Sequence, residues 1–98
     1  MTPLERDIER KLRLQIEALG GKCLKWTCPG WSGVPDRIVL MPGGKVYFVE
    51  TKRPKDGSLS AMQRWWHVQL EQLGFSCQVV WDQTDLNCFI EFIQRRTS

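Results

Sequence analysis

The sequence lacks the features of a membrane, secreted or zinc-binding protein. No apolar run approaches the ~20 residues that a membrane-spanning helix needs, and the first residues contain no apolar core of a signal peptide. The cysteines form no C-x-x-C pair and the only histidine is His67, so a structural zinc site is not expected. We therefore expect a cytoplasmic protein with reduced and mostly buried thiols, which are Cys23, Cys28, Cys77 and Cys88.

Repeats, linkers and low-complexity segments are also absent. The 98 residues, 42% of them hydrophobic and 26% charged, predict one globular domain over residues 1–98 rather than a disordered chain. The net charge of +3 permits nucleic-acid binding without requiring it. Because no cysteine or serine nucleophile lies near His67 in the sequence, a histidine-based hydrolase is not supported.

Hydrophobic spacing predicts the order α-β-β-β-α-β-α, and therefore an α/β fold in which helices pack on a mixed sheet. The first helix begins at a capping box, Thr2 to Glu5, and ends at Gly20-Gly21. Strands are expected over residues 22–27, 37–41, 46–51 and 75–81, with a second helix over 60–73 and a third from about residue 84.

Each expected helix carries an apolar stripe that should face the sheet. The stripes are Leu4, Ile8, Leu12, Ile16 and Leu19 in the first helix, Met62, Trp66, Leu70 and Leu73 in the second, and Leu86, Phe89, Ile90 and Ile93 in the third. Trp26 and Trp81 lie in strand-like runs, so we expect both in the core.

Two acids and a lysine lie at the ends of two neighbouring strands. Asp36 follows Pro35 and precedes one strand, and Glu50-Thr51-Lys52 ends the next. Because side chains alternate along a strand, Glu50 and Lys52 point to the same face. A lysine beside two acids can bind a phosphate or polarise a water.

The register of the hairpin decides whether the two carboxylates meet. If Met41 pairs with Lys45 around a three-residue loop, Asp36 lies opposite Glu50 on one face, whereas the neighbouring register sends Asp36 to the other face. Two converging acids form a hard oxygen site suited to Mg²⁺ or Mn²⁺. Taken alone, each acid has a plainer interpretation, with Asp36 as a turn residue and Glu50 as an exposed residue at a strand end.

Two helical residues are further candidates for this site. Glu9 lies on the same face as Glu5, but Glu5 closes the capping box, whereas Glu9 has no such role and borders the buried stripe. Glu9 therefore either faces the metal site or forms an ordinary i,i+4 pair with Arg13. Gln63 forms a capping box with Ser60, which alone explains the residue, although a helix N-terminus near the site also favours phosphate oxygens.

Basic and aromatic residues surround the same motifs. The cations nearest in sequence are Arg37, Lys52, Arg53, Lys55 and Arg64. Trp31 lies in the loop before Asp36, and Trp65 is expected on the exposed side of the second helix. Exposed aromatic side chains near cations stack on unpaired bases or fill a subunit interface, and the sequence does not decide between these roles.

Four segments carry a family resemblance over most of the chain, from Glu5 to Ile90. They are Gly33-Val34-Pro35-Asp36-Arg37, Phe48 to Pro54, Ser58-Leu59-Ser60 with Gln63, and Leu73-Gly74-Phe75. Together they resemble the VRR-NUC family, the virus-type replication-repair nucleases of the PD-(D/E)XK superfamily. The resemblance implies a restriction-endonuclease-like core with a mixed sheet flanked by helices.

The resemblance also implies a site. Asp36, Glu50 and the Thr51 carbonyl would bind Mg²⁺ or Mn²⁺, and Lys52 would position or activate the attacking water. Gln63 matches the family's glutamine on the following helix. The acid of the leading helix maps to Glu9, as a catalytic residue and possible metal ligand, with Glu5 as the other option. Thr51 departs from the family pattern, which has an apolar residue at this position.

The implied activity is metal-dependent hydrolysis of DNA by an endonuclease, leaving a 5′-phosphate and a 3′-hydroxyl. Stand-alone members of this size resemble phage and prophage nucleases, which act as homodimers on branched DNA such as four-way (Holliday) junctions. Phosphate contacts are expected from Arg37, Arg53, Lys55 and Arg64. Spare apolar surface for a dimer is expected on Trp65, the last helix and the loop around Trp31. The alternatives are a flap or nicking nuclease and a non-catalytic DNA-binding module that keeps the fold.

Overall fold

The computed structural model describes the backbone of residues 3–52 and 58–97, and side chains from Arg6 to Lys52 and from Ser58 to Arg96. Its elements are α1 (Pro3–Ala18), β1 (Lys22–Lys25), β2 (Arg37–Met41), β3 (Lys45–Thr51), α2 (Ala61–Gln72), β4 (Ser76–Val80) and α3 (Gln83–Thr97). This confirms the expected order and the mixed α/β class. The predicted capping box at Thr2 and Glu5 lies outside the described side chains.

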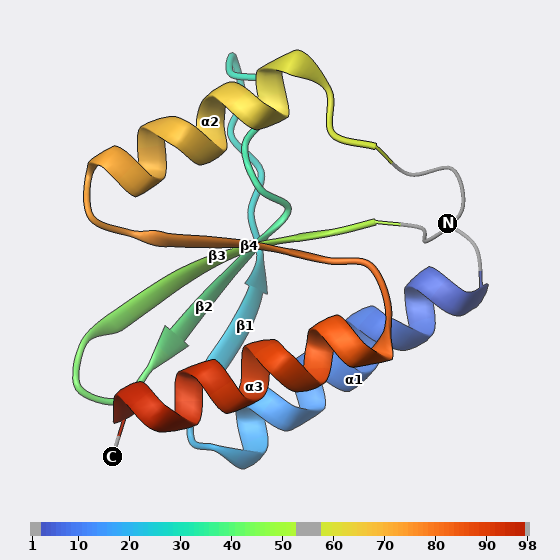
Figure 1. Cartoon of the computed structure of the whole chain (residues 1–98), viewed down its shortest axis with the longest axis vertical. Helices are drawn as coiled ribbons and strands as arrows, with labels where there is room; N and C mark the ends of the chain where they lie inside the picture. The colour runs from blue at the N-terminus through green and yellow to red at the C-terminus, as the bar shows by residue number, and fades with distance from the viewer. Residues whose placement is uncertain (1–2, 53–57, 98) are drawn as a thin grey trace.

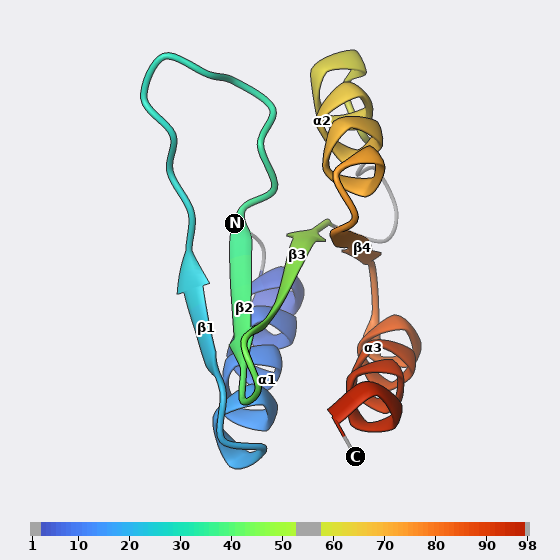
Figure 2. The same ribbon diagram turned by 90° about the vertical axis from the view of Figure 1, so that its left-hand side faces the viewer.

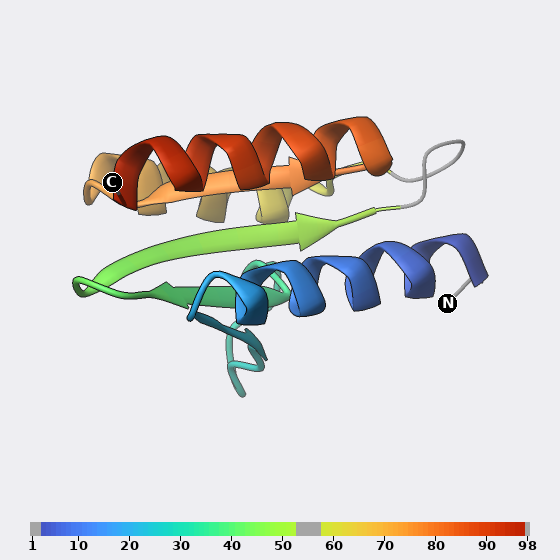
Figure 3. The ribbon, with the colours of Figure 1, turned by 90° about the horizontal axis from the view of Figure 1, so that it is seen from below.

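The four strands form one mixed sheet in the order β1-β2-β3-β4. β1, β2 and β3 are antiparallel neighbours, and β4 pairs with β3 in parallel. A parallel pair needs a crossover connection, and α2 provides it. Figure 1 shows α2 on one side of the sheet and α1 with α3 on the other. In Figure 3, α1 and α3 both lie on the side of the sheet that faces the viewer. Within the described residues, no helix is long and apolar enough to span a membrane.

The β2–β3 hairpin has the register that sets the start of β2 opposite the end of β3. Met41 pairs with Lys45, and Arg37 pairs with Val49. The loop between the strands contains Gly43 at φ 86° and Gly44 at φ 75°, which are left-handed conformations that favour glycine. The predicted register is therefore confirmed for Arg37 to Met41, and it places Asp36 and Glu50 at the same end of the hairpin. Asp36 precedes the paired residues and contacts Thr51, whereas Glu50 contacts Gln63 of α2, so the expected meeting of the two carboxylates on one face stays a prediction.

Two hydrophobic cores lie on opposite faces of the sheet. The larger core joins the sheet to α1 and α3, and its buried residues are Ile8, Leu12, Ile16, Cys23, Val39, Met41, Tyr47, Val49, Val80, Leu86, Phe89 and Ile93. The smaller core lies under α2 and consists of Phe48, Leu70 and Cys77. Because successive β3 side chains alternate, Phe48 enters the small core and Val49 the large one. The described residues of the stripes predicted for α1 and α3 face the large core, with Leu19 and Ile90 only partly buried, and Leu4 lies outside the described side chains.

The stripe predicted for α2 is confirmed at Leu70 and wrong at Met62 and Leu73. Met62 is 43% exposed and Leu73 is 73% exposed, whereas His67 and Leu70 are buried. The buried face of α2 contains His67 and Leu70, while the Trp66 ring packs against Trp31 of the loop before β2. Helical spacing alone could not distinguish these two surfaces, since both are apolar.

Two expectations about burial also need correction. Trp26 and Trp81 are half-buried rather than in the core, since β1 ends at Lys25 and β4 at Val80, one residue before each tryptophan. The cysteines are all free, but Cys23 and Cys77 are buried, Cys28 is half-buried and Cys88 is exposed. Burial raises the pKa of Cys23 to about 11 and that of Cys77 to about 12, so both thiols are protonated at neutral pH.

Candidate active site

The candidate site lies where β2 begins and β3 ends. The main-chain N–H of Trp26 donates to the carbonyl of Asp36 at 2.8 Å, which continues the β1–β2 pairing by one residue and holds the backbone at Asp36. On the other side, the N–H of Lys52 donates to the carbonyl of Val80 at 3.0 Å and continues the β3–β4 pairing. The backbone on both sides of the site is therefore fixed by the sheet.

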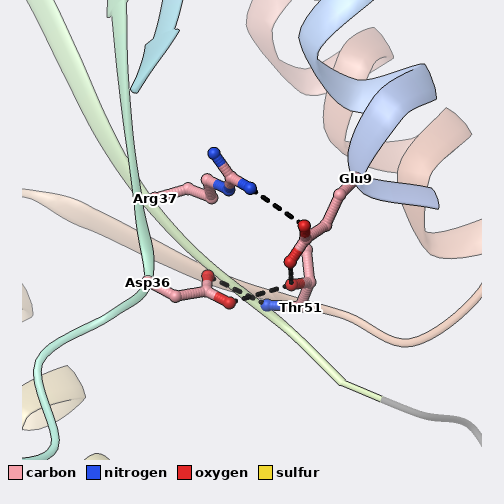
Figure 4. Close-up of polar contacts among 4 residues, drawn as sticks. All are labelled: Glu9, Asp36, Arg37 and Thr51. Carbon is pink, nitrogen blue, oxygen red and sulfur yellow. Dashed lines mark hydrogen bonds and ion pairs between the residues drawn. The ribbon is translucent and has the colours of Figure 1, made fainter. Parts of the chain in front are cut away.

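A polar network at this point joins α1, β2 and β3 (Figure 4). The Thr51 hydroxyl lies 2.9 Å from Asp36 Oδ2 and 3.0 Å from Glu9 Oε1, and the Thr51 N–H donates to Asp36 Oδ1 at 3.3 Å. Arg37 Nη2 donates to Glu9 Oε2 at 2.9 Å. A hydroxyl has one proton, so Thr51 can donate to only one of the two carboxylates at a time.

The network holds two acidic side chains, Glu9 and Asp36, close together in a largely buried environment. Burial raises the pKa of Asp36. Hydrogen bonds from the side chain and backbone of Thr51 oppose this rise, the Glu9 carboxylate adds to it, and Arg37 opposes it. The side chains of Arg37 and Glu9 are only 20% and 12% exposed, so their ion pair is partly shielded from solvent. A cation between the two acids would offset their repulsion.

Glu50 points to the α2 side, where it meets Gln63. The Glu50 side chain is 4% exposed, and Gln63 Nε2 lies 3.4 Å from its Oε1. The other end of the same amide closes the capping box, because Gln63 Oε1 accepts from the Ser60 N–H at 2.8 Å while Ser60 Oγ accepts from the Gln63 N–H at 3.1 Å. Gln63 therefore caps α2 and also contacts the candidate site residue Glu50.

The cations predicted around the site have different environments. Arg37 is bound to Glu9 and faces α1, whereas Arg64 is exposed and its Nη1 donates to the Leu59 carbonyl at 2.6 Å. Lys52 is half-buried at the end of β3. Arg53 and Lys55 lie outside the described residues. Of the two predicted phosphate contacts that the structure describes, Arg37 and Arg64, Arg64 is thus the exposed one.

The structure brings some of the predicted site residues together. Glu9 and Asp36 meet at Thr51, and Glu50 meets Gln63. Within residues 3–52 and 58–97, no group of three or more histidine, cysteine, aspartate or glutamate side chains is arranged to hold a metal ion. A metal ion shared by Asp36 and Glu50 therefore stays a prediction.

Two features of the site were missed in the sequence. The first is the side-chain role of Thr51, although a polar residue where the family has an apolar one was a signal. The second is the ion pair between Glu9 and Arg37, which lie 28 residues apart. The i,i+4 alternative is not formed, since Arg13 pairs with Glu17 instead. Among the described side chains of α1, Glu9 contacts Thr51 and Arg37 at the candidate site, whereas the Glu5 side chain lies outside the described residues.

Comparisons with known proteins agree on the class that this fold and site define. No family model matches the sequence. A solved structure described as a VRR_NUC domain superposes with a TM-score of 0.85 and 29% identity, over 92% of this chain and 97% of that chain. A protein of Acyrthosiphon pisum secondary endosymbiont phage 1, named "Putative nuclease p44", is 37% identical over 86 residues, which are 88% of this chain and 90% of that protein. The chain belongs to the VRR-NUC family of the PD-(D/E)XK superfamily.

Proposed function

We propose that the protein is a metal-dependent endonuclease that hydrolyses phosphodiester bonds in DNA. The observation that carries the proposal is the convergence of Glu9 and Asp36 on Thr51, the residue next to Glu50, at the end of β3. This constellation lies within a VRR-NUC fold, and the phage relative is named as a nuclease. A nuclease from a phage would act in the cytoplasm of its bacterial host.

The donor atoms at the site fit a hard divalent cation. Asp36, Glu50 and the Thr51 carbonyl would hold Mg²⁺ or Mn²⁺, with Glu9 as a possible further ligand, since carboxylate and carbonyl oxygens are the ligands these ions prefer. Glu9 and Asp36 share one hydroxyl proton, and their other donors among the described residues are Arg37 for Glu9 and the Thr51 N–H for Asp36. When bound, such an ion lowers the pKa of a water and stabilises charge on the phosphate.

The remaining residues would position the reactants. Lys52, at the end of β3, would orient the attacking water and the scissile phosphate. Gln63 would hold the Glu50 carboxylate in place through its amide, and Arg37 would do the same for Glu9. The N-terminus of α2 contains exposed Arg64 and no acid in its first turn, so it would favour a phosphate of the DNA backbone.

Nicking of supercoiled plasmid in Mg²⁺ and in EDTA tests the proposal. We expect nicking in Mg²⁺ alone, and its loss by at least about a hundredfold in Asp36→Asn and Glu50→Gln, since each removes a charged ligand. Equal nicking by wild type and both variants, at matched folding and limiting Mg²⁺, would show that the acids are not the site. DNA binding without any metal-dependent nicking would favour a non-catalytic binding module.

Glu9 needs a control of its own, because its carboxylate also holds Arg37. We expect Glu9→Gln to lower nicking by tenfold or more, whereas Glu17→Gln, which removes a similar charge from the exposed pair with Arg13 on the same helix, should leave nicking within twofold. If Glu9→Gln is silent and Glu5→Gln is not, the leading-helix acid is Glu5.

We propose further that the substrate is branched DNA such as a four-way junction, and that the protein is a homodimer. Symmetrical cutting of a junction needs two sites related by a two-fold axis, which a C₂ dimer provides. α3 has no exposed large apolar side chain among its described residues, so the structure does not support the last helix as the apolar interface. Leu24 and Leu40, by contrast, are 48% and 39% exposed on the sheet face that faces α2, and α2 packs against β4 rather than against β1 and β2.

Light scattering and a panel of junction, flap, nicked and linear duplexes test this finer proposal. We expect a dimer that cuts the junction best, and we expect Leu24→Glu with Leu40→Glu to yield monomers. A wild-type monomer that cuts flaps or simple duplexes would favour the flap or nicking alternative and leave the nuclease proposal standing.

A further inference from the structure

We propose that Trp31 and Trp65 form a surface beside the candidate active site on which unpaired nucleobases of the DNA stack. The inference rests on the proposed DNA nuclease and names the part of the substrate that this surface holds. Trp31 is 58% exposed and Trp65 is 46% exposed, which are large values for tryptophan side chains in so small a protein.

The two exposed rings are held in place by a third. Trp66 lies between them, with its ring centroid 5.7 Å from that of Trp31 and 5.1 Å from that of Trp65, and both contacts are edge-to-face. The Trp66 indole N–H donates to the Ser32 carbonyl at 3.0 Å, which fixes the central ring to the loop. Exposed rings that are already ordered lose little conformational entropy when a ligand binds them.

At Gly33 the same loop packs closely against the start of α2. It has φ +88°, and a Cβ atom at this position would lie 2.7 Å from Met62 Cβ and 2.9 Å from the Met62 carbonyl oxygen. Only a residue without a side chain fits there, so the loop and the helix are in close contact. Figures 1 and 2 show this loop and α2 rising from the same end of the sheet.

This contact places the aromatic surface next to the acids. Three residues after Gly33 the chain reaches Asp36, and one residue after Met62 on α2 is Gln63, whose amide lies 3.4 Å from Glu50. DNA that lies on Trp31 and Trp65 would also lie beside the two strand ends. The occupant that fits this position is therefore the DNA itself.

The charge around the rings complements DNA. Arg64 is exposed next to Trp65, its Nη1 is tied to the Leu59 carbonyl, and the first turn of α2 contains no acid. A cation beside aromatic faces is the combination that binds unpaired strands, because the phosphates meet the cation while the bases stack. Bases in a continuous duplex are already stacked on each other. The surface would therefore select DNA with unpaired bases, as at a branch point or a bulge.

Binding in EDTA, where cleavage cannot occur, tests the inference by fluorescence anisotropy. The probes are a labelled duplex with a central bulge of several thymines and a continuous duplex of the same length. We expect Trp31→Ala and Trp65→Ala to weaken binding of the bulged probe by about tenfold each, the scale of one lost stacked base, and binding of the continuous duplex by less than twofold. Trp31→Phe and Trp65→Phe should retain most of the preference.

Leu73→Ala is the matched control, because Leu73 is 73% exposed near the other end of α2 and should not affect either probe. Thermal melts identify any variant whose folding is altered, and the phenylalanine variants then carry the test. Unchanged binding of the bulged probe by the tryptophan variants, or equal loss of binding for both probes, would overturn the inference. Tryptophan variants that only dissociate a dimer, with unchanged DNA binding, would also overturn it. Wild-type plasmid nicking is scored separately, so failure of stacking and failure of the nuclease proposal give different results.

Discussion

Thr51 and Asp36 are joined twice, once through the Thr51 backbone and once through its hydroxyl. The N–H donates to Oδ1 at 3.3 Å and the hydroxyl to Oδ2 at 2.9 Å, so both oxygens of the Asp36 carboxylate are held from one residue. The same hydroxyl lies 3.0 Å from Glu9. The Thr51 hydroxyl thus links the two acids.

Thr51→Val should expose this role, because valine keeps the shape and removes the hydroxyl. We expect the Mg²⁺ concentration for half-maximal nicking to rise by about tenfold and the free energy of unfolding in EDTA to fall by about 1–3 kcal/mol, as buried acids lose a donor. Thr51→Ser keeps the hydroxyl and should stay close to wild type in both measurements. Equal behaviour of the valine and serine variants would mean that the hydroxyl does not matter.

Asp36→Asn should stabilise the metal-free protein while it abolishes nicking. Since burial raises the pKa of Asp36, the ionised carboxylate disfavours folding at neutral pH. This cost is complete above the folded pKa and is removed as the pH falls through the folded pKa towards the ordinary value of 3.8. Asparagine is neutral and removes this cost. We therefore expect a higher melting temperature than wild type in EDTA at neutral pH, and a smaller difference at about pH 4.

The same comparison in Mg²⁺ gives the check on the Asp36 prediction. Added Mg²⁺ should raise the melting temperature of wild type and not that of Asp36→Asn, since a ligand stabilises only a state that binds it. If Asp36→Asn is less stable than wild type in EDTA at neutral pH, the ionised Asp36 carboxylate does not destabilise the metal-free fold.

Gly33→Ala should damage both stability and activity, and Gly30→Ala provides a close control. Both glycines have positive φ, at +88° and +87°, but an added Cβ meets Met62 only at Gly33 and meets nothing within 4 Å at Gly30. We expect Gly30→Ala to cost about 1 kcal/mol from backbone strain alone and to leave nicking intact. Gly33→Ala should cost more and reduce nicking severalfold, measured by urea unfolding and plasmid assay. Similar costs for both would exclude a role for the contact with Met62.

His67 should make the protein lose stability in mild acid. Its Nε2 is buried and has no hydrogen-bond partner among the described residues, and burial lowers its pKa below the ordinary 6.5, with Glu71 opposing the shift. The stabilising contribution of the neutral ring is complete above pH 6.5 and decreases as the pH falls below that value.

His67→Leu should remove this dependence. The difference in melting temperature between wild type and His67→Leu, measured from neutral pH downwards, isolates it from the opposite trend of Asp36. We expect the melting temperature of His67→Leu to rise relative to that of wild type as the pH falls below 6.5. A difference in melting temperature that does not change with pH would show that folding does not lower the pKa of His67.

The sequence predicted the features that local rules determine. The glycines after Pro42 set the hairpin register, and the spacing of Ser60 and Gln63 set the start of α2. It failed where two distant segments compete for one side chain. Trp66 packs against Trp31 of the loop, and Glu9 pairs across 28 residues with Arg37. Neither contact has a periodic signal, because each depends on how the loop and α1 approach the sheet.

The unequal size of the two cores has a consequence for how the molecule opens. Among the described residues, the hydrophobic core under α2 has three buried residues, whereas the opposite core has twelve. Amide hydrogen exchange should therefore give a lower opening free energy for α2 than for α1 and α3. We expect α2 to open as one cooperative unit before the rest of the fold. Such an opening would separate Gln63 from Glu50 while Glu9, Asp36 and Thr51 stay together, so half of the site would survive it. Any ligand that spans both halves would then slow exchange in α2 selectively.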